Sequence, residues 1–316
     1  MTVRLSAVCG QVENATIVRD GEFSSLGFTT SRNQKPLRLL FLDDERAVDQ
    51  ILSSVEFSCL IVSTSLWPRV SKCPATVGVC IADEPRWVFF SIHNYLSRHT
   101  GFYDSSKRVG RRGSYRAHPT AIIDDEAIIG DGVTIGPYSV ISGRTTIEDE
   151  VDVGPFCALG GYGFQYARGV KGLLYVDHVG ELVIHPRVHM RSHVCIDIPV
   201  LDEETSVGED TKIDSFVKIG HGSSIGARCL VGAHAVLTGN VYVDDDVWIS
   251  AGTTVRNRVT LGSNSKTSLG AVVTQDTERH SHVSGNFAIP HDVFIENLKS
   301  SANRSSHESE KHRMKE

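Results

Sequence analysis

Aliphatic residues recur at every sixth position along the middle of this 316-residue chain. One run steps by six from Ile123 to Leu159, and a second steps from Val207 to Val273 with Thr267 as its one departure. A small or β-branched residue stands two positions before each anchor, as Ala127 does before Ile129. Amphipathic helices and alternating strands repeat roughly every 3.6 and every two residues, so neither explains this spacing. Both sets of positions are therefore expected to point into a core.

A period of six is typical of a hexapeptide β-helix. Each hexad supplies a short strand and a corner, and three hexads close one coil of about 18 residues. Successive coils stack at the inter-strand spacing of about 4.8 Å. The fold class predicted for most of the chain is therefore mainly β, a parallel β-helix.

Two insertions interrupt the hexads, at residues 160–183 and 197–206. Loops that leave a solenoid are common places for binding residues. The first insertion carries Tyr162, Phe164 and Tyr166. These aromatic side chains are therefore candidates for substrate binding.

A different pattern precedes the coil. Apolar runs at residues 37–42 and 57–64 predict buried strands, and residues 44–54 and 84–99 predict helices. Strands that alternate with helices indicate a small α/β domain. We expect this domain to occupy residues 1–116. The coil should follow over residues 117–274, with its loop at 160–183, and residues 275–316 predict a short helix and a flexible tail.

Composition excludes several classes of protein. A formal charge of −6 gives no basic footprint for nucleic acid. No run approaches the roughly 20 apolar residues that span a bilayer, so no membrane span is expected. The first residues lack the pattern of a secretory signal. The seven cysteines show no C-x-x-C spacing, which favours a cytoplasmic protein with reduced thiols.

Three stretches carry a resemblance to a known family: GYGFQYARG at 161–169, CIDIPVLDEET at 195–205 and KIDSFVKIGHGSSIG at 212–226. Together with the order of the parts, they resemble the UDP-3-O-acylglucosamine N-acyltransferases of lipid A biosynthesis. They also resemble the related amino-sugar N-acyltransferases of lipopolysaccharide O-antigen and other surface polysaccharides. The resemblance implies a left-handed coil and a cytoplasmic homotrimer with active sites between adjacent coils. It also implies that the domain at residues 1–116 binds a nucleotide sugar, and that the acyl donor is a thioester on coenzyme A or acyl carrier protein.

The family's catalytic histidine falls on His221. Histidine suits proton transfer at neutral pH, and one coil further along the chain lies Gly239, whose N–H is our candidate donor to the oxyanion. The resemblance also places Asp197 and Asp214 at family positions. Asp214 precedes His221 by about one hexad and should act only through a neighbouring subunit. His234 is close enough in sequence to line the same cleft.

Features of the sequence narrow the substrate class. The family's base-stacking aromatic pair falls on Phe41 and Ala47, so one partner is missing. Fewer hexads precede the aromatic loop than in lipid A enzymes, and the C-terminal extension is shorter. These departures favour a nucleotide-linked amino sugar, on UDP or dTDP, and a short acyl group such as acetyl or 3-hydroxybutyryl. The alternative is UDP-3-O-(3-hydroxyacyl)glucosamine, the substrate of the lipid A enzyme.

Two other classes share this coil. A zinc-dependent carbonic anhydrase places a second histidine five positions before its counterpart of His221, because zinc needs converging imidazoles. Phe216 stands there in this chain, so no metal is expected. A non-catalytic scaffold is the third hypothesis, and it leaves the aromatic loop and His221 unexplained.

Overall fold

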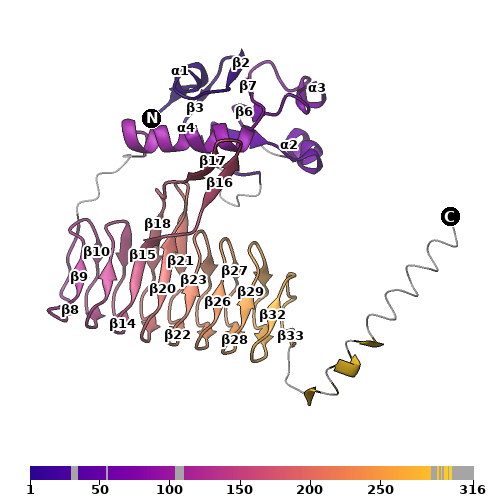
Figure 1. Cartoon of the computed structure of the whole chain (residues 1–316). Coiled ribbons are helices and arrows are strands. Elements are labelled where there is room, and N and C mark those ends of the chain that lie inside the picture. The colour runs from indigo at the N-terminus through magenta and orange to yellow at the C-terminus, as the bar shows by residue number, and fades with distance from the viewer. Residues whose placement is uncertain are drawn as a thin grey trace.

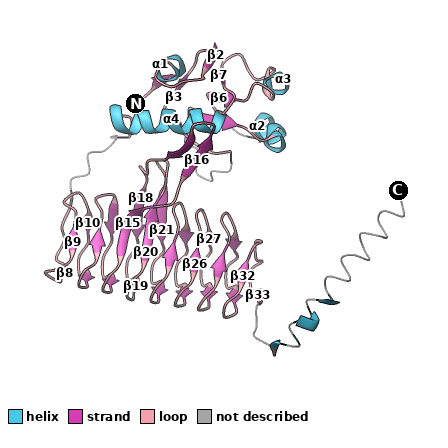
Figure 2. Ribbon diagram, in the orientation of Figure 1, coloured by secondary structure: helices cyan, strands magenta, loops and turns pink. Residues whose placement is uncertain are grey.

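Three parallel sheets wind around a common core from Arg116 to Val283, and a smaller N-terminal domain lies above this coil in Figure 1. The computed structural model describes residues 1–29, 35–54, 56–103 and 110–285, together with 290, 291, 293, 295–297, 299 and 300. Figure 2 shows that helices are confined to the N-terminal domain and the C-terminal end, while the coil consists of short strands and turns. The expected parallel β-helix is confirmed.

Each face of the coil is one sheet. The first face contains β10 (Ile128–Ile129), β13 (Thr145–Ile147), β18 (Glu181–Ile184), β21 (Glu204–Val207), β24 (Ser224–Ile225), β27 (Tyr242–Val243) and β30 (Thr260–Leu261). The second contains β8 (Arg116–Ala117), β11 (Thr134–Ile135), β14 (Asp152–Val153), β19 (His189–Met190), β22 (Lys212–Ile213), β25 (Leu230–Val231), β28 (Trp248–Ile249), β31 (Lys266–Thr267) and β33 (His282–Val283). The third contains β9 (Ile122–Ile123), β12 (Val140–Ile141), β15 (Ala158–Tyr162), β20 (Cys195–Ile198), β23 (Lys218–Ile219), β26 (Val236–Leu237), β29 (Thr254–Val255) and β32 (Val272–Val273).

The aliphatic anchors form the core of the coil. Ile141 pairs with Ile123 on one side and with Leu159 on the other, one coil away in each direction. The small residues two positions earlier are buried as well, and the polar ones satisfy their hydroxyl groups. Ser139 and Ser223, both fully buried, donate to main-chain carbonyls of the next coil at 2.8 and 3.0 Å. A hydroxyl at these positions therefore caps a corner without leaving an unpaired polar atom.

The N-terminal domain is a five-stranded sheet between two layers of helices. Its strand order is β2 (Thr16–Arg19), β7 (Gly78–Ile81), β6 (Cys59–Val62), β5 (Arg38–Leu42) and β4 (Ser25–Leu26), parallel except for β2. A small ladder joins β1 (Val3–Arg4) to β3 (Glu22–Phe23). The helical segments are α1 (Leu5–Cys9), η1 (Glu45–Ala47), α2 (Val48–Ser54), α3 (Trp67–Val70) and α4 (Pro85–His99).

Alternate residues of these buried strands face opposite helical layers. In β5, Leu39 packs in a cluster with α1 and α4, whereas Leu40 and Leu42 pack in a second cluster with α2 and α3. The four strands and helices expected from residues 37–42, 57–64, 44–54 and 84–99 are present. The other elements of this domain are too short to show a hydrophobic period, so the sequence did not predict them.

Both insertions leave the coil at the same edge, between the third and the first face. We call this edge the loop corner; it comprises the connections from β9 to β10, β12 to β13, β15 to β18, β20 to β21, β23 to β24, β26 to β27 and β29 to β30. The long insertion contains a hairpin of β16 (Tyr166–Gly169) and β17 (Gly172–Tyr175), which rises from the coil toward α4 in Figure 1.

Main-chain and side-chain bonds join the hairpin to α4. Asn94 donates to the Tyr175 carbonyl at 2.7 Å and accepts from the Asp177 N–H at 3.0 Å. Arg98 forms a bidentate ion pair with the Asp177 carboxylate. His93, fully buried on α4, donates from Nε2 to the Asp177 carbonyl at 2.9 Å. The N-terminal domain is thereby fixed over the loop corner.

The coil continues beyond residue 274, because β33 pairs with β31. Each described residue between His291 and Ser300 is helical, and the tail expected over residues 301–316 lies outside the described residues. Among the helices that the structure describes, none has the length and apolar character needed to cross a membrane.

Candidate active site

His221 lies on the loop corner, in the turn between β23 and β24. Its carbonyl accepts a hydrogen bond from the Asn240 N–H at 2.8 Å, which ties its backbone to the next coil. Burial lowers the pKa of the imidazole; the nearby carboxylate of Asp197 opposes this shift and the Lys218 ammonium adds to it. The ring is therefore neutral at pH 7, the form that a general base requires.

Gly239 lies directly beside this imidazole. A Cβ built on Gly239 would be 2.7 Å from His221 Nε2 and 2.9 Å from Cε1, well inside van der Waals contact. Gly239 is also not among the glycines with positive φ. The His221 ring therefore occupies the space that a side chain at position 239 would need.

The N–H of Gly239 has no role in the hydrogen bonding of the coil. Within the described residues it donates to no main-chain or side-chain acceptor, while its neighbours Thr238 and Asn240 both donate. Proline, which has no N–H, occupies the same position of the hexad, two residues after the anchor, at another edge of the coil, as Pro137 and Pro155 show. This N–H is therefore available to a ligand next to His221.

Asp197 is buried close to His221, on β20 of the preceding coil. It is 7% exposed and forms an ion pair with Lys218. A Cβ built on Gly163 would lie 3.3 Å from its second oxygen and 3.0 Å from His221 Cδ2. Asp197 and the glycine of the aromatic loop therefore both border the histidine, as a candidate binding residue should.

A second histidine, not singled out by the sequence analysis, completes this group. His178, at the end of the long insertion, is 5% exposed, and its ring centroid is 6.0 Å from that of His221 in an edge-to-face arrangement. Its Nε2 accepts a hydrogen bond from the Gly163 N–H at 3.1 Å. Burial, followed by the charge of His221, lowers the pKa of His178 to about 4, against weaker opposing effects of Asp197 and the Val176 carbonyl.

These contacts fix the protonation state of His178. Because Nε2 accepts, the proton of the neutral ring resides on Nδ1, which is buried and has no hydrogen bond of normal geometry in the described part of the chain. His178 holds the aromatic loop against His221 while staying uncharged. The signal that could have found it is its place in the insertion, just before the coil resumes at β18.

The aromatic residues of the loop surround this group with exposed rings. Tyr162, Phe164 and Tyr166 are 70%, 91% and 42% exposed. Phe164 packs against Tyr166 at 5.0 Å between centroids, and Tyr162 packs against His178 at 5.8 Å. Large apolar rings left in solvent beside a buried histidine are suited to covering a ligand.

The structure does not bring Asp214 or His234 to His221. Both lie at the edge between the second and third faces. There, His234 stacks on Phe216 at 4.9 Å, and the stack continues through His193, Phe156 and Tyr138. His234 is near His221 in sequence but not in space within one chain, because one hexad moves the chain to the next face. Asp214 remains a residue that could reach His221 only from another subunit.

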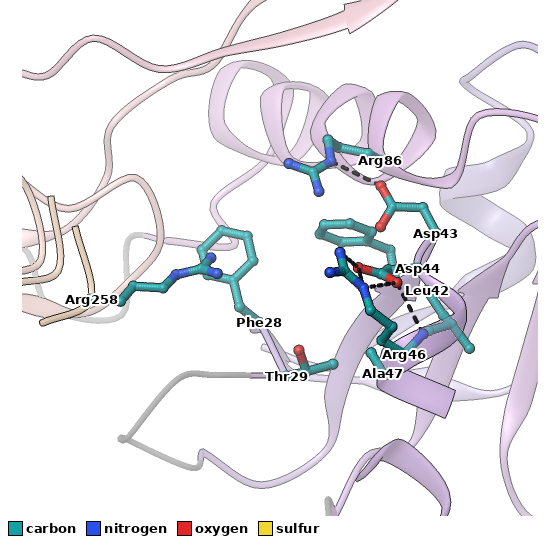
Figure 3. A pocket seen from close by; sticks show the side chains of 10 residues that line it. Phe28, Thr29, Leu42, Asp43, Asp44, Arg46, Ala47, Arg86 and Arg258 are labelled. Atoms are coloured by element: carbon teal, nitrogen blue, oxygen red, sulfur yellow. Dashed lines mark hydrogen bonds and ion pairs between the residues drawn. The ribbon is translucent and has the colours of Figure 1, made fainter. Parts of the chain in front are cut away.

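A cavity of about 360 Å³ opens in the N-terminal domain at the carboxyl ends of β4 and β5. It brings together Phe41 and Ala47, with Phe28, Asp43, Asp44, Arg46 and Arg86 of the same domain and Arg258 of the coil among the other lining residues (Figure 3). Arg86 lies 5.2 Å from the Phe41 centroid and pairs with Asp43 at 2.9 Å. Crevices at the carboxyl ends of parallel strands are common ligand sites.

The described residues contain no group of three or more His, Cys, Asp or Glu side chains placed to hold a metal ion. Phe216, where the carbonic anhydrase pattern has histidine, lies on a different edge from His221.

Comparison with solved structures finds several acyltransferases. A UDP-N-acetylglucosamine acyltransferase of Francisella novicida is 23% identical over 57% of this chain, with a TM-score of 0.37, and this chain spans 66% of its length, just under two thirds. The Campylobacter jejuni UDP-N-acetylglucosamine acyltransferase is 20% identical over 54% of this chain and 72% of its own, with a TM-score of 0.46. A mutant perosamine N-acetyltransferase of Caulobacter crescentus, in complex with CoA and GDP-perosamine, is 16% identical over 77% of this chain and 72% of its own, with a TM-score of 0.30.

A search of curated protein sequences finds no significant match. A family model does match within the coil, over residues 126–161 and 204–239. These segments include most of the first run of anchors, His221 and Gly239. Over these two segments the coil is thus similar to the six-residue repeats described as bacterial transferase hexapeptide.

Proposed function

We propose that the protein is an N-acyltransferase that moves an acyl group from a phosphopantetheine thioester to the amine of a nucleotide-linked amino sugar. The observation that carries this proposal is the pair formed by His221 and Gly239. A neutral, half-buried imidazole lies beside a main-chain N–H that the coil leaves unused. Acyl transfer needs both a base and an oxyanion donor.

In the proposed reaction, His221 Nε2 accepts a proton from the amine as its nitrogen attacks the thioester carbonyl. The carbon–nitrogen bond forms, and the carbonyl oxygen becomes an oxyanion that accepts a hydrogen bond from the Gly239 N–H. The tetrahedral intermediate then collapses and the carbon–sulfur bond breaks. The proton held by His221 passes to the leaving thiolate, which departs as the thiol and leaves the imidazole neutral.

Other residues would position the reactants. Gly163 and His178 hold the aromatic loop beside His221, and Tyr162, Phe164 and Tyr166 would cover the sugar or the acyl chain. Asp197 would bind the substrate from the preceding coil. Asp214 would contribute from an adjacent subunit of a homotrimer. Phe41 would pack against the nucleotide base in the N-terminal cavity.

The finer points of the proposal concern the substrate and the setting. The acyl group would be short, such as acetyl or 3-hydroxybutyryl, and its carrier coenzyme A or acyl carrier protein. The enzyme would act in the cytoplasm on precursors of surface polysaccharides such as O-antigen. Its reaction would need no metal. The lipid A substrate, UDP-3-O-(3-hydroxyacyl)glucosamine, is the alternative that the experiment below separates.

The test is a panel of UDP- and dTDP-linked amino sugars and UDP-3-O-(3-hydroxyacyl)glucosamine, each incubated with short and long acyl donors on both carriers and analysed by mass spectrometry. Acylation of an amine should appear, and His221→Ala should lower its rate by about 10²–10⁴-fold without loss of fold. His282→Ala, at the far end of the coil, is the matched control. Near-wild-type turnover of His221→Ala would exclude its role as the base.

A further inference from the structure

Arg258 is the coil's contribution to a cavity that otherwise belongs to the N-terminal domain. It lies on the loop corner, in the turn between β29 and β30. Figure 3 shows its side chain entering from the coil, next to Phe28, with Arg86 and Arg46 across the cavity. A residue of the coil, which also carries His221, therefore lines this N-terminal cavity.

The cations around this cavity differ in what neutralises them. Arg86 pairs with Asp43 at 2.9 Å, and Arg46 pairs with Asp44 at 2.6 Å. The hydrogen bonds from Arg46 lower the pKa of Asp44 to about 2. Within the described residues, the guanidinium of Arg258 makes neither an ion pair nor a side-chain hydrogen bond, although its main-chain N–H donates to the Gly239 carbonyl at 3.3 Å. Among the described residues, the positive charge of Arg258 at the cavity mouth is thus not paired with a carboxylate.

The walls of the cavity suit a planar group. Phe28 and Phe41 line it, with ring centroids 6.3 Å apart and planes nearly perpendicular. Ala47 adds only a methyl group to this wall. An aromatic wall with an unpaired guanidinium at its mouth fits a molecule with a flat base at one end and phosphate next to it.

The spacing along the loop corner relates this cavity to His221. The His221 carbonyl accepts from the Asn240 N–H, and the Gly239 carbonyl accepts from the Arg258 N–H. These two steps place Arg258 two coils beyond the turn of His221, a backbone separation of about 10 Å at the usual strand spacing. One pyranose ring and its phosphate can span such a distance.

We infer that Arg258 binds the diphosphate of a nucleotide-linked substrate whose base occupies the N-terminal cavity of the same chain, so that this cavity and His221 of one chain serve one substrate molecule. The inference rests on the proposed function for the identity of the sugar end. The sugar would lie over Asn240 and present its amine to the imidazole.

Binding measurements test the phosphate contact without requiring turnover. Isothermal titration with UDP, dTDP and GDP, and with the matching nucleosides, should show that Arg258→Ala weakens diphosphate binding about ten- to a hundred-fold. Its nucleoside binding should equal that of the wild type. Arg258→Lys should recover part of the loss. Arg256→Ala is the matched control, because Arg256 is exposed in the same turn but does not line the cavity.

The possible results separate the two hypotheses. If the wild type binds no nucleoside diphosphate, or Arg258→Ala binds it as tightly as the wild type does, the inference is wrong. If binding depends on Arg258 but no amine is acylated by any donor, the site stands and the proposed reaction is wrong. With an active substrate, Arg258→Ala should raise KM about tenfold or more and leave kcat within about threefold.

A mixing experiment tests whether one chain supplies both parts. His221→Ala and Arg258→Ala chains are co-expressed with different tags, and assemblies containing both are purified. If base and phosphate sites act within one chain, no site in the mixture has both residues, and the wild-type KM should not return. Recovery of wild-type kinetics would show that the cavity of one chain serves His221 of another.

Discussion

Replacing Gly239 by alanine is the sharpest test of the geometry around His221. The new Cβ would lie 2.7 Å from His221 Nε2, where carbon and nitrogen atoms normally keep at least about 3.4 Å. The imidazole must therefore shift by a sizeable fraction of an ångström. Because Gly239 does not have a positive φ, alanine adds little backbone strain, and the stacking of Leu237 and Val243 is unaffected.

The expected loss follows from that displacement. A misplacement of about 1 Å in a catalytic group can lower the rate about 10²-fold, which corresponds to about 2.7 kcal/mol of transition-state stabilisation. We predict a fall of this order in kcat/KM for Gly239→Ala, a melting temperature within about 2 °C of the wild type, and unchanged binding of nucleoside diphosphate.

Two measurements complete this test. Histidine side-chain NMR should show that the His221 resonances move in Gly239→Ala, which requires no substrate. Gly285→Ala is the matched control, because a Cβ there would meet no atom of the described residues within 4 Å. A Gly239→Ala protein with wild-type turnover and an unmoved imidazole would refute the reasoning. A protein that loses stability would make Gly239 a structural corner.

Two further predictions concern the buried histidines. His178→Ala removes the acceptor of the Gly163 N–H and should lower kcat about tenfold or more while nucleotide binding persists. The amide oxygen of His178→Gln can accept the same hydrogen bond, so this variant should retain much of the wild-type rate. Equal rates for the two variants would exclude a positioning role for His178. The pKa of His93 is lowered to about 4 by burial, so the unfolded chain takes up a proton near pH 6.5 that the folded chain refuses. The His93 contribution to folding stability should therefore be nearly complete above about pH 6.5 and fall as the pH drops toward 4, by about 2 kcal/mol at pH 5. Urea unfolding should show that His93→Gln removes this part of the pH dependence and leaves the part due to His178, whose pKa is also lowered to about 4. A wild-type stability that is constant from pH 7 to 5, or a His93→Gln variant with the same pH dependence as the wild type, would contradict this prediction.

The six-residue period is sufficient to predict the coil. An aliphatic residue at every sixth position, with a small residue two places earlier, can be buried only if the chain turns after each hexad, so the stacking of Ile123, Ile141 and Leu159 follows from spacing alone. The same register places Gly239 next to His221, because one coil adds about 18 residues. These features are periodic and local, and a sequence displays both.

Packing between segments that are distant in sequence determines the parts of the site that the six-residue period does not predict. His178 meets His221 because the insertion folds back over the corner, and the path of an insertion depends on its packing against α4 rather than on any repeat. Arg258 enters the cavity beside Phe28 because the N-terminal domain lies over the loop corner. His234 lies on another edge because a hexad, unlike a full coil, turns the chain to a new face. Contacts between separately patterned segments arise only in the folded chain, and no spacing within one segment encodes them.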